Sequence, residues 1–345
     1  MTPDEEFNKA DDLIKKGAYD EASKIYIKIR RLYAELAPFC DYRLAVISNN
    51  TGDPLAAYDL YYSAFNAAPD IAAFIYGGDH PNTNYVFKGK KDEIETAACP
   101  ICGNLDIRPR WCYPLTEAAG FNSFFNPIRL WMYCELCHHM VARHFPEKLF
   151  LYNDGPRSPN PTYFSYYSGI LDRISRYAQG MSLFEVGIGA CECLLAAQEI
   201  GFDAFGIDVI DRHVQMARDK YGLNADTADF VEFRSDRKFD IIIMGDVLEH
   251  VSDPVAAMHK ANELLNDDGA IWVSTPNFDS AYSIVVGHDD PMKKQQYHLN
   301  YFSRHSYYTL LEKCGFVPVD YSISSHYRGS MEVISIKSHR VESNA

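Results

Sequence analysis

The sequence lacks long apolar runs and a secretory leader, and each absence removes a class of protein. No apolar stretch approaches the ~18 residues of a membrane-spanning helix, so we expect neither a membrane span nor a membrane partner. The first twenty residues, MTPDEEFNKADDLIKKGAYD, are polar and acidic, unlike a signal peptide. We therefore expect a cytoplasmic protein.

Basic residues are also scarce relative to acidic ones. The chain carries 33 lysines and arginines against 47 aspartates and glutamates, which gives a net charge of -14. A field of that sign repels a phosphate backbone, so no nucleic-acid partner is expected. The 345-residue chain is 47% hydrophobic, which is enough for the cores of two or three domains.

Residues 1–90 have the pattern of helices, and small and aromatic residues recur along them at a fixed spacing. The recurring positions are Ala10, Gly17, Ala22 and Tyr26, matched by Ala45, Gly52, Ala57 and Tyr61. The period is close to the ~34 residues of tetratricopeptide repeats, and the segment resembles two such repeats, the first degenerate. Two roles stay open: a helical hairpin packed on the next domain, or a surface that recruits a protein partner.

Residues 91–150 contain two C-x-x-C pairs among the nine cysteines of the chain. Two such pairs converge on one ion and complete a tetrahedral zinc site, here formed by Cys99, Cys102, Cys134 and Cys137. Four thiolates leave no open coordination position, so the sequence predicts a structural Zn²⁺ in a ribbon-like module. The alternatives are a ligand from His138 or His139 in place of one cysteine, or buried free cysteines without metal.

From residue 151 to 345 strands and helices alternate. Apolar runs at 181–186, 203–209, 239–245 and 270–276 are typical of parallel strands buried on both faces. Two last strands are joined by a short connection and must be antiparallel. The predicted fold class is α/β, a doubly wound and mostly parallel sheet with a C-terminal antiparallel hairpin, preceded by an all-α helical-repeat segment and a small zinc-binding module.

The helix expected near residue 162 carries an aromatic cluster, Tyr163, Phe164, Tyr166 and Tyr167. Aromatic side chains at this place either cover the sheet or close over a ligand. Both interpretations stay open from the sequence.

The stretch LFEVGIGACECLLAAQ places two glycines between the first strand of this region and the next helix. Gly187 and Gly189 lie at the carboxyl end of a strand, where ligands of this fold bind, and Asp208 at the end of the second strand is placed to meet ribose hydroxyls. A dinucleotide would press its pyrophosphate against Glu192, and Glu185 adds another negative charge. S-adenosylmethionine is cationic and carries no phosphate, so the sequence favours it over a nicotinamide dinucleotide.

Five blocks in order carry a resemblance to a known family: FEVGIGA, GIDV, FDIIIMGDVLEHVSDP, LLNDDGAIWVSTPN and HLNYFSRHSYYTLLEKCGF. Over roughly residues 160–338 the chain resembles class I S-adenosylmethionine-dependent methyltransferases. With the cysteine module ahead of it, the layout also resembles a bacterial subgroup linked to the tailoring of sugars and secondary metabolites.

The resemblance implies a role for each matching position. Glu185 would hold the methionine ammonium, Gly187 and Gly189 would present their backbone to the cofactor, and Asp208 would bind the ribose. Cys191 departs from the family pattern, since glycine is commoner there.

Three further acidic residues are implied by the same resemblance. The adenine amino group would meet Asp226 or Asp229, between which the sequence does not choose. Asp246, after the fourth strand, would lie beside the methionine end.

Methyl transfer to a hydroxyl needs alignment and a base, and a histidine is well matched to that task near neutral pH. His250 follows the strand that ends near Asp246 and is the first candidate. The alternative is that Glu249 and His250 brace this loop by hydrogen bonds. His298 and His288 are rival bases in the segment after the fifth strand.

Together these patterns predict an S-adenosylmethionine-dependent methyltransferase that acts on a small molecule, with transfer to an oxygen of a sugar or secondary metabolite. The alternatives are a protein or peptide acceptor held by the helical repeats, and an interaction protein whose methyltransferase-like domain no longer reacts. A dehydrogenase is disfavoured by Glu192 and by the C-terminal hairpin.

Overall fold

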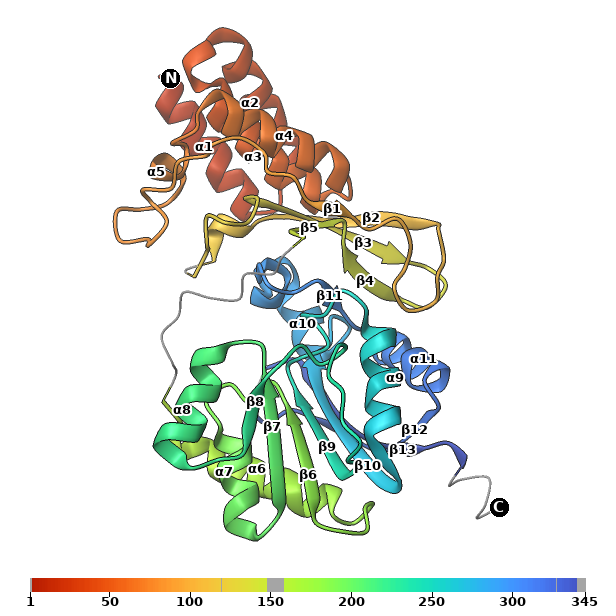
Figure 1. Cartoon of the computed structure of the whole chain (residues 1–345). Helices are drawn as coiled ribbons and strands as arrows, with labels where there is room; N and C mark the ends of the chain where they lie inside the picture. The colour runs from red at the N-terminus through yellow and green to blue at the C-terminus, as the bar shows by residue number, and fades with distance from the viewer. Residues whose placement is uncertain (1, 119, 148–157, 327, 340–345) are drawn as a thin grey trace.

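The computed structural model describes residues 2–118, 120–147, 158–326 and 328–339. Helices form its N-terminal part, a small antiparallel sheet lies in the middle, and a large α/β domain forms the C-terminal part (Figure 1). The boundary expected between residues 150 and 151 lies outside the described residues.

Four consecutive helices form two hairpins at the N-terminus: α1 (Pro3–Lys15), α2 (Tyr19–Leu32), α3 (Ala37–Asn50) and α4 (Pro54–Ala67), followed by a short α5 (Ala72–Ile75). Gly17 and Gly52, which correspond in the predicted repeat, have φ values of 73° and 90° just after the first helix of each hairpin. Tyr26 and Tyr61, also a corresponding pair, are both buried. The helices predicted for this segment are present, while the likeness to tetratricopeptide repeats stays a prediction.

The middle sheet combines three neighbouring strands with one from far along the chain. Its order is β11-β4-β3-β2 with every pair antiparallel, and the bounds are Ile107–Pro114 (β2), Ile128–Cys134 (β3), His139–Ala142 (β4) and Asn300–Tyr301 (β11). A separate pair joins β1 (Ile94–Glu95) to β5 (His144–Phe145). Because β11 belongs to the large domain, the cysteine-bearing module and the large domain share one sheet.

Different parts of the chain pack on the two faces of this middle sheet. Helix α4 packs on one face, where Phe65 and Leu130 share an apolar cluster that also contains the fully buried Cys112. The other face carries Trp131 and Tyr301. The second helical hairpin is therefore packed on the next module, as one of its two predicted roles requires.

The large sheet has the order β12-β13-β10-β9-β6-β7-β8. Its strands are β6 (Ser182–Val186), β7 (Asp203–Asp208), β8 (Ala225–Thr227), β9 (Phe239–Gly245), β10 (Leu265–Pro276), β12 (Phe316–Ile323) and β13 (Ser330–Lys337). All pairs from β8 to β10 are parallel, and β13 runs against both β10 and β12. The prediction of a mostly parallel α/β sheet with a C-terminal antiparallel hairpin is confirmed.

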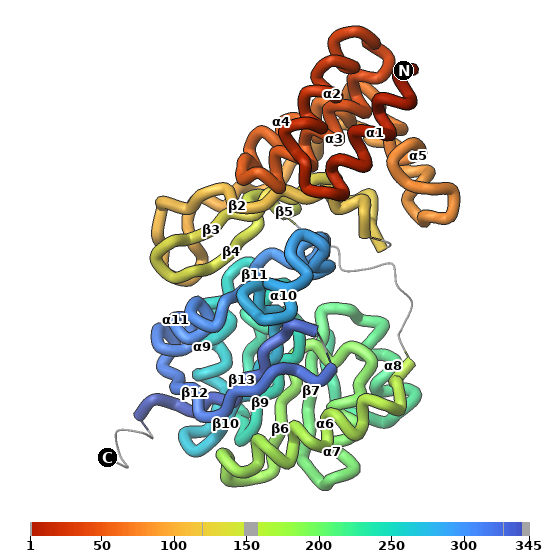
Figure 2. Tube along the Cα trace, turned by 180° about the vertical axis from the view of Figure 1, so that it is seen from behind, coloured from red at the N-terminus to blue at the C-terminus, as the bar shows by residue number. Residues whose placement is uncertain are grey.

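Helices cover both faces of the large sheet because successive strand residues point to opposite sides. Leu183 joins the core under α6 (Pro161–Ile174), α7 (Glu192–Ile200) and α8 (Asp211–Tyr221), whereas Phe184 joins the core under α9 (Pro254–Leu264) and α11 (Arg304–Lys313). Figure 2 shows the molecule from behind, with α6 and the hairpin β12–β13 toward the viewer. Within the described ranges, no helix combines the length and apolar character needed to cross a bilayer.

Candidate active site

A cavity of about 620 Å³ opens beyond the carboxyl ends of β6 and β9. Strand order reverses here, since β6 pairs with β7 on one side and β9 on the other, and ligands of doubly wound sheets bind at such points. Most lining residues come from four segments, 158–167, 185–192, 245–250 and 292–298. The segment predicted to bind the cofactor and the two histidines predicted to be bases thus face one cavity.

The turn after β6 lines the cavity at the end where the cofactor is predicted to bind. Gly187 and Gly189 have φ values of 76° and 48°, in the left-handed region that favours glycine. Cys191 also has a left-handed φ of 70° at the start of α7, and its thiol is fully buried. This conformation explains why glycine suits the position and shows that the chain accepts a small side chain there at some cost in strain.

Four carboxylates line the cavity, those of Glu185, Glu192, Asp246 and Glu249, and no lysine or arginine is among the described lining residues. The Glu185 side chain is 5% exposed, and its Oε2 is buried without a hydrogen-bond partner. Burial raises the pKa of Glu185 well above its usual range, and the neighbouring Glu192 and Asp208 raise it further. An orphaned acidic oxygen in such a wall suits a cationic ligand and opposes a pyrophosphate.

Glu192 joins the two helices beside the cofactor end. Its Oε1 accepts a hydrogen bond of 2.9 Å from the backbone N–H of Asn160, the residue that caps α6. The sequence pattern gave no signal for this contact, which lies 32 positions apart along the chain.

Two other acidic residues predicted to bind the cofactor, Asp208 and Asp226, are not part of the cavity lining. Asp208 is buried and accepts backbone hydrogen bonds from Gly189 (3.0 Å) and Ile210 (2.8 Å), so it holds the turn but is not part of the lining. Asp226 is exposed and pairs with Arg218. Their roles toward ribose and adenine stay predictions.

Asp229, the other candidate for the adenine contact, is also exposed. Its Oδ1 accepts backbone hydrogen bonds from Val231 (2.9 Å) and Glu232 (3.3 Å) and so caps a turn after β8. Like Asp226, it is not part of the cavity lining, so the geometry does not choose between the two.

Asp246 lies in the cavity wall directly after β9. Its φ of 54° is left-handed, and its Oδ1 accepts a hydrogen bond of 3.2 Å from Ser274 Oγ. The backbone N–H of Asp246 also donates to the Ser274 carbonyl at 3.0 Å. Two contacts from the neighbouring strand β10 therefore aim this carboxylate into the cavity.

Glu249, His250 and His298 lie together in one part of the cavity, called its acceptor end below because the two predicted bases are there. Glu249 is 1% exposed; its Oε2 accepts from Thr275 Oγ1 at 3.0 Å, and its Oε1 is buried without a partner. His250 Nδ1 donates to the Tyr297 carbonyl at 3.0 Å, which leaves the lone pair on its Nε2. The two imidazole rings lie 4.9 Å apart, edge to face.

Burial sets the protonation of these three groups. It lowers the pKa of His250 to about 4 and that of His298 well below its usual range. It raises the pKa of Glu249, and the nearby Asp246 raises it further. Both imidazoles are therefore neutral near pH 7, and His250 both lines the cavity and braces the loop, so the two interpretations of this residue are compatible. His288, the other rival base, instead contacts the Tyr113 hydroxyl at 2.7 Å and is not in the lining.

The cysteine-bearing module holds the segment that carries His298, a connection that the sequence did not reveal. Arg129 of β3 is fully buried and donates to the carbonyls of Gln296 (2.7 Å) and His298. Trp131 Nε1 donates to the Lys293 carbonyl at 2.8 Å. The acceptor end is thus built partly from residues of another module.

Asn300 of β11 forms a second link between the two modules. Its Oδ1 lies 3.0 Å from His139 Nε2, and its Nδ2 donates to the carbonyl of Val251 at 2.7 Å, next to His250. The contact with Asn300 occupies one ring nitrogen of His139, and the other, Nδ1, is buried without a hydrogen-bond partner.

The aromatic cluster of α6 divides between the cavity and the sheet. Tyr163 and Tyr167 line the cavity, and Phe164, Tyr166 and Tyr167 pack against the core under α6. Packing on the sheet is confirmed for part of the cluster, and closure over a ligand stays a prediction for Tyr163 and Tyr167.

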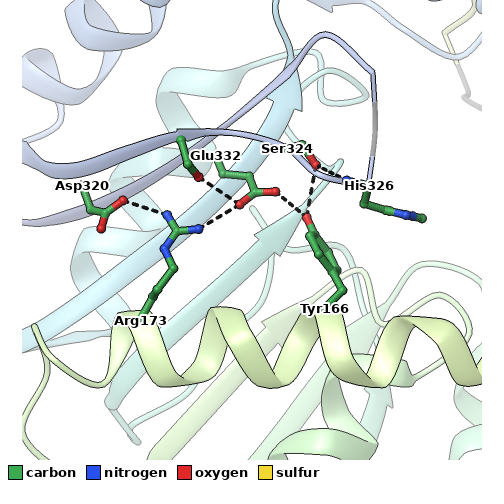
Figure 3. Close-up of polar contacts among 7 residues, drawn as sticks. Tyr166, Arg173, Asp320, Ser324, His326 and Glu332 are labelled. Carbon is green, nitrogen blue, oxygen red and sulfur yellow. Dashed lines mark hydrogen bonds and ion pairs between the residues drawn. The ribbon is translucent and has the colours of Figure 1, made fainter.

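A polar clamp keeps α6 against the C-terminal hairpin, as Figure 3 shows. Tyr166 donates to Glu332 Oε1 at 2.8 Å, and Arg173 contacts the other Glu332 oxygen at 3.1 Å and Asp320 at 2.7 Å. Glu332 is 3% exposed, so these contacts compensate a buried charge. The clamp fixes the helix that carries Tyr163 and Tyr167.

The four predicted zinc ligands, Cys99, Cys102, Cys134 and Cys137, form one cluster whose sulfur atoms all lie within 4.8 Å of one another. Two Sγ–Sγ distances are 3.4 Å and 3.5 Å. Zinc–sulfur bonds of about 2.3 Å in a tetrahedron place sulfur atoms about 3.8 Å apart, so the donor set fits the ion closely.

Comparison with known proteins agrees with this geometry. Residues 162–321 match the model of a family described as "Methyltransferase domain". The methyltransferase domain that the sequence predicted is confirmed for this part of the chain.

Curated relatives match over part of their length. A ubiquinone biosynthesis O-methyltransferase of Cereibacter sphaeroides is 30% identical over 155 residues, which cover 41% of this chain and 62% of the relative. The protein of the same name from Actinobacillus pleuropneumoniae is 31% identical over 131 residues, which cover 34% of this chain and 56% of the relative. The chain thus spans less than two thirds of the length of these relatives.

Among solved structures, one similar chain is the 1,6-didemethyltoxoflavin-N1-methyltransferase of Burkholderia thailandensis, with bound 1,6-didemethyltoxoflavin and S-adenosylhomocysteine. It is 16% identical, with a TM-score of 0.42, over 52% of this chain and 79% of that chain.

Proposed function

We propose that this chain is an S-adenosylmethionine-dependent methyltransferase that transfers the methyl group to a hydroxyl oxygen of a small molecule. The observation that carries the proposal is the cavity at the switch point of the sheet, with a glycine turn, four carboxylates and no lysine or arginine among its described lining. Two relatives named as O-methyltransferases support oxygen as the acceptor atom.

The residues divide into a donor end and an acceptor end. Glu185, with its orphaned oxygen, would hold the methionine ammonium, and Gly187 and Gly189 would let the cofactor approach the backbone. The cofactor supplies an activated methyl group on a sulfonium. Asp246 would stabilise that cationic end, and His250 and His298, which line the same cavity, would help to remove the proton of the acceptor.

Cofactor selectivity tests the donor end. Calorimetric titration with S-adenosylmethionine, S-adenosylhomocysteine and NAD should show binding of the first two and none of the third. Binding of NAD with neither of the others would reject the proposal in favour of a dehydrogenase.

The acceptor class needs a second experiment. Incubation with methyl-labelled cofactor and fractionated extract of the source organism should place the label in low-mass material. Label in a protein band would instead support the alternative of a protein or peptide acceptor held by the helical hairpins. Cofactor binding without any labelled product in either fraction would support a non-catalytic interaction protein.

The cysteine cluster is proposed to hold a structural Zn²⁺. Its four sulfur atoms leave no coordination position for a substrate, and Arg129 and Trp131, which hold the acceptor end, lie on the strand that ends at Cys134. The ion would therefore stabilise the wall of the active site without taking part in the chemistry.

A further inference from the structure

A second group of metal-binding side chains lies inside the cavity itself. One potential ligand atom from each of Glu249, His250 and His298 lies within 4.8 Å of the other two. An ion bonded tetrahedrally to nitrogen and oxygen at about 2.0–2.2 Å places its ligand atoms about 3.3–3.6 Å apart. Shifts of about one ångström would therefore bring all three to one ion.

The hydrogen bonds around these residues orient them as bonds around metal ligands do. His250 gives its Nδ1–H to the Tyr297 carbonyl, so the other ring nitrogen is left as a donor to an ion. Thr275 holds one oxygen of Glu249, and the other oxygen is buried without a partner. His298 Nδ1 is also buried without a partner. Orphaned buried atoms are costly, and a bound cation would satisfy them.

The carboxylates of the cavity lining could balance the charge of a second cation beside the cofactor. S-adenosylmethionine brings two positive groups and one carboxylate, whereas the lining offers four carboxylates and no described lysine or arginine. Asp246, in the wall next to Glu249, adds negative charge at the acceptor end.

We propose that Glu249, His250 and His298 bind a first-row divalent metal ion at the acceptor end of the cavity. Two histidines and one glutamate are a ligand set that zinc and its neighbours accept, and three protein ligands leave a position open for an oxygen. This site is distinct from the cysteine cluster, whose four thiolates close the coordination sphere.

The coordination position left open on the ion limits which kind of acceptor can bind, an inference that rests on the proposed function. A hydroxyl on the ion loses its proton more readily, as water does on zinc, and the proton passes to solvent. The resulting oxygen attacks the methyl carbon, the carbon–sulfur bond breaks, and its electron pair stays on sulfur. The acceptor is therefore an acidic hydroxyl that can ligate a metal, such as a phenol or a hydroxyl beside a second oxygen.

Metal binding is tested with Co²⁺ added to full-length protein that carries a single equivalent of zinc, in the cysteine cluster, followed by visible absorption and calorimetry. One equivalent should bind with the absorption of nitrogen and oxygen ligands, without the thiolate charge-transfer bands that the cysteine cluster would give. Glu249→Gln and His298→Gln should each weaken Co²⁺ binding at least 100-fold. Thr275→Val, which removes only the hydroxyl that orients Glu249, should weaken it about 10- to 100-fold.

Control variants distinguish the loss of a metal-ligating side chain from misfolding of the protein. His259→Gln changes an exposed histidine of α9 and should leave Co²⁺ affinity unchanged. Affinity for S-adenosylhomocysteine should stay within about threefold in every variant. Equal Co²⁺ binding by the wild type and by Glu249→Gln would overturn the site, as would thiolate-type spectra alone.

The metal site and the proposed methyltransferase function can be rejected independently of each other. Methyl transfer at an undiminished rate after removal of metal from the cavity would reject the role of the ion and leave the methyltransferase standing. Co²⁺ binding by a protein that takes up no S-adenosylmethionine would keep the metal site and reject the proposed function.

Discussion

The donor and acceptor ends of one cavity are built in different ways. The donor end comes from a short continuous stretch, β6, its glycine turn and the start of α7, so its residues are neighbours along the chain. The acceptor end joins residues 249–250, 275 and 297–298. From the cysteine-bearing module, Arg129 donates to the His298 carbonyl and Trp131 to the Lys293 carbonyl just before it. One end depends on local backbone conformation, and the other depends on contacts between distant segments.

The largest difference between the two ends should appear when the cysteine cluster is broken. Cys137→Ser should release one equivalent of zinc and lower the free energy of unfolding by several kcal/mol, on the order of 4. The damage should fall on the acceptor end, because Arg129 and Trp131 are carried by the same module. Metal analysis and denaturant unfolding measure both effects.

A matched cysteine separates metal loss from packing loss. Cys112 is fully buried in the same sheet but lies outside the cluster. Cys112→Ala should keep the zinc and lose only about 1 kcal/mol. Equal zinc content in both variants would contradict the assignment of the four ligands.

A change at the donor end should weaken cofactor binding and leave the acceptor end intact. Glu185→Gln removes the charge that faces the ammonium, and a hydrogen bond to a charged group contributes about 1.5–3 kcal/mol, or roughly 10- to 150-fold in affinity. Calorimetry with S-adenosylhomocysteine measures the loss. Glu199→Gln, on the exposed face of α7, should have no effect.

Glu185 also gives the donor end a pH dependence of known sign. Because its pKa is raised in the folded, empty protein, the side chain holds its proton to higher pH than in the unfolded chain. This contribution to stability is complete below the unfolded pKa and is lost as pH rises through the folded one. The cofactor needs the ionised form, so affinity should fall as pH is lowered.

Melting temperatures check this pH argument without any substrate. The empty Glu185→Gln protein should lose less stability than the wild type as pH rises, because it has no buried carboxylate to ionise. Parallel melting curves for the two proteins across the pH range would contradict the assignment.

The acceptor end should respond to a residue that touches neither ligand. Arg129→Met leaves the carbonyls of Gln296 and His298 without their donor, so we expect turnover to fall about 10- to 100-fold through misplacement of His298. Cofactor affinity should change less than threefold. Hydrogen exchange across residues 290–300 should rise, and Arg108→Met, an exposed arginine of β2, should leave it unchanged.

The smallest effect is expected at the clamp on α6. Tyr166→Phe removes one hydrogen bond to the buried Glu332, with which Arg173 still pairs, so the cost should be at the low end for a charged acceptor, about 1.5 kcal/mol. Thermal unfolding measures the change. A loss as large as that of Cys137→Ser would show that the clamp, and not the cysteine cluster, dominates the stability of the cavity wall.

The same contrast explains what could be predicted from the sequence. Strands β6, β7 and β9 were predicted to within a residue, and so was the end of β10, because each one carries its own apolar run; α10 (Ala281–Val286) and β11 were not predicted. The glycine turn and Glu185 were found for the same reason. Arg129 and Thr275 were not found, because their partners lie 167 and 26 positions away and leave no trace in any local pattern.

The shared strand β11 makes the cysteine-bearing module and the large domain depend on each other for folding. Residues 300–301 complete the sheet of a module that precedes them by more than 150 positions, so neither part folds its edge without the other. A transplant of residues 158–339 into another protein would carry the methyl-donor pocket but leave its opposite wall unsupported. We therefore expect exchange of either half alone to disrupt the wall beside His298, whereas substitutions within the joined pair would preserve it.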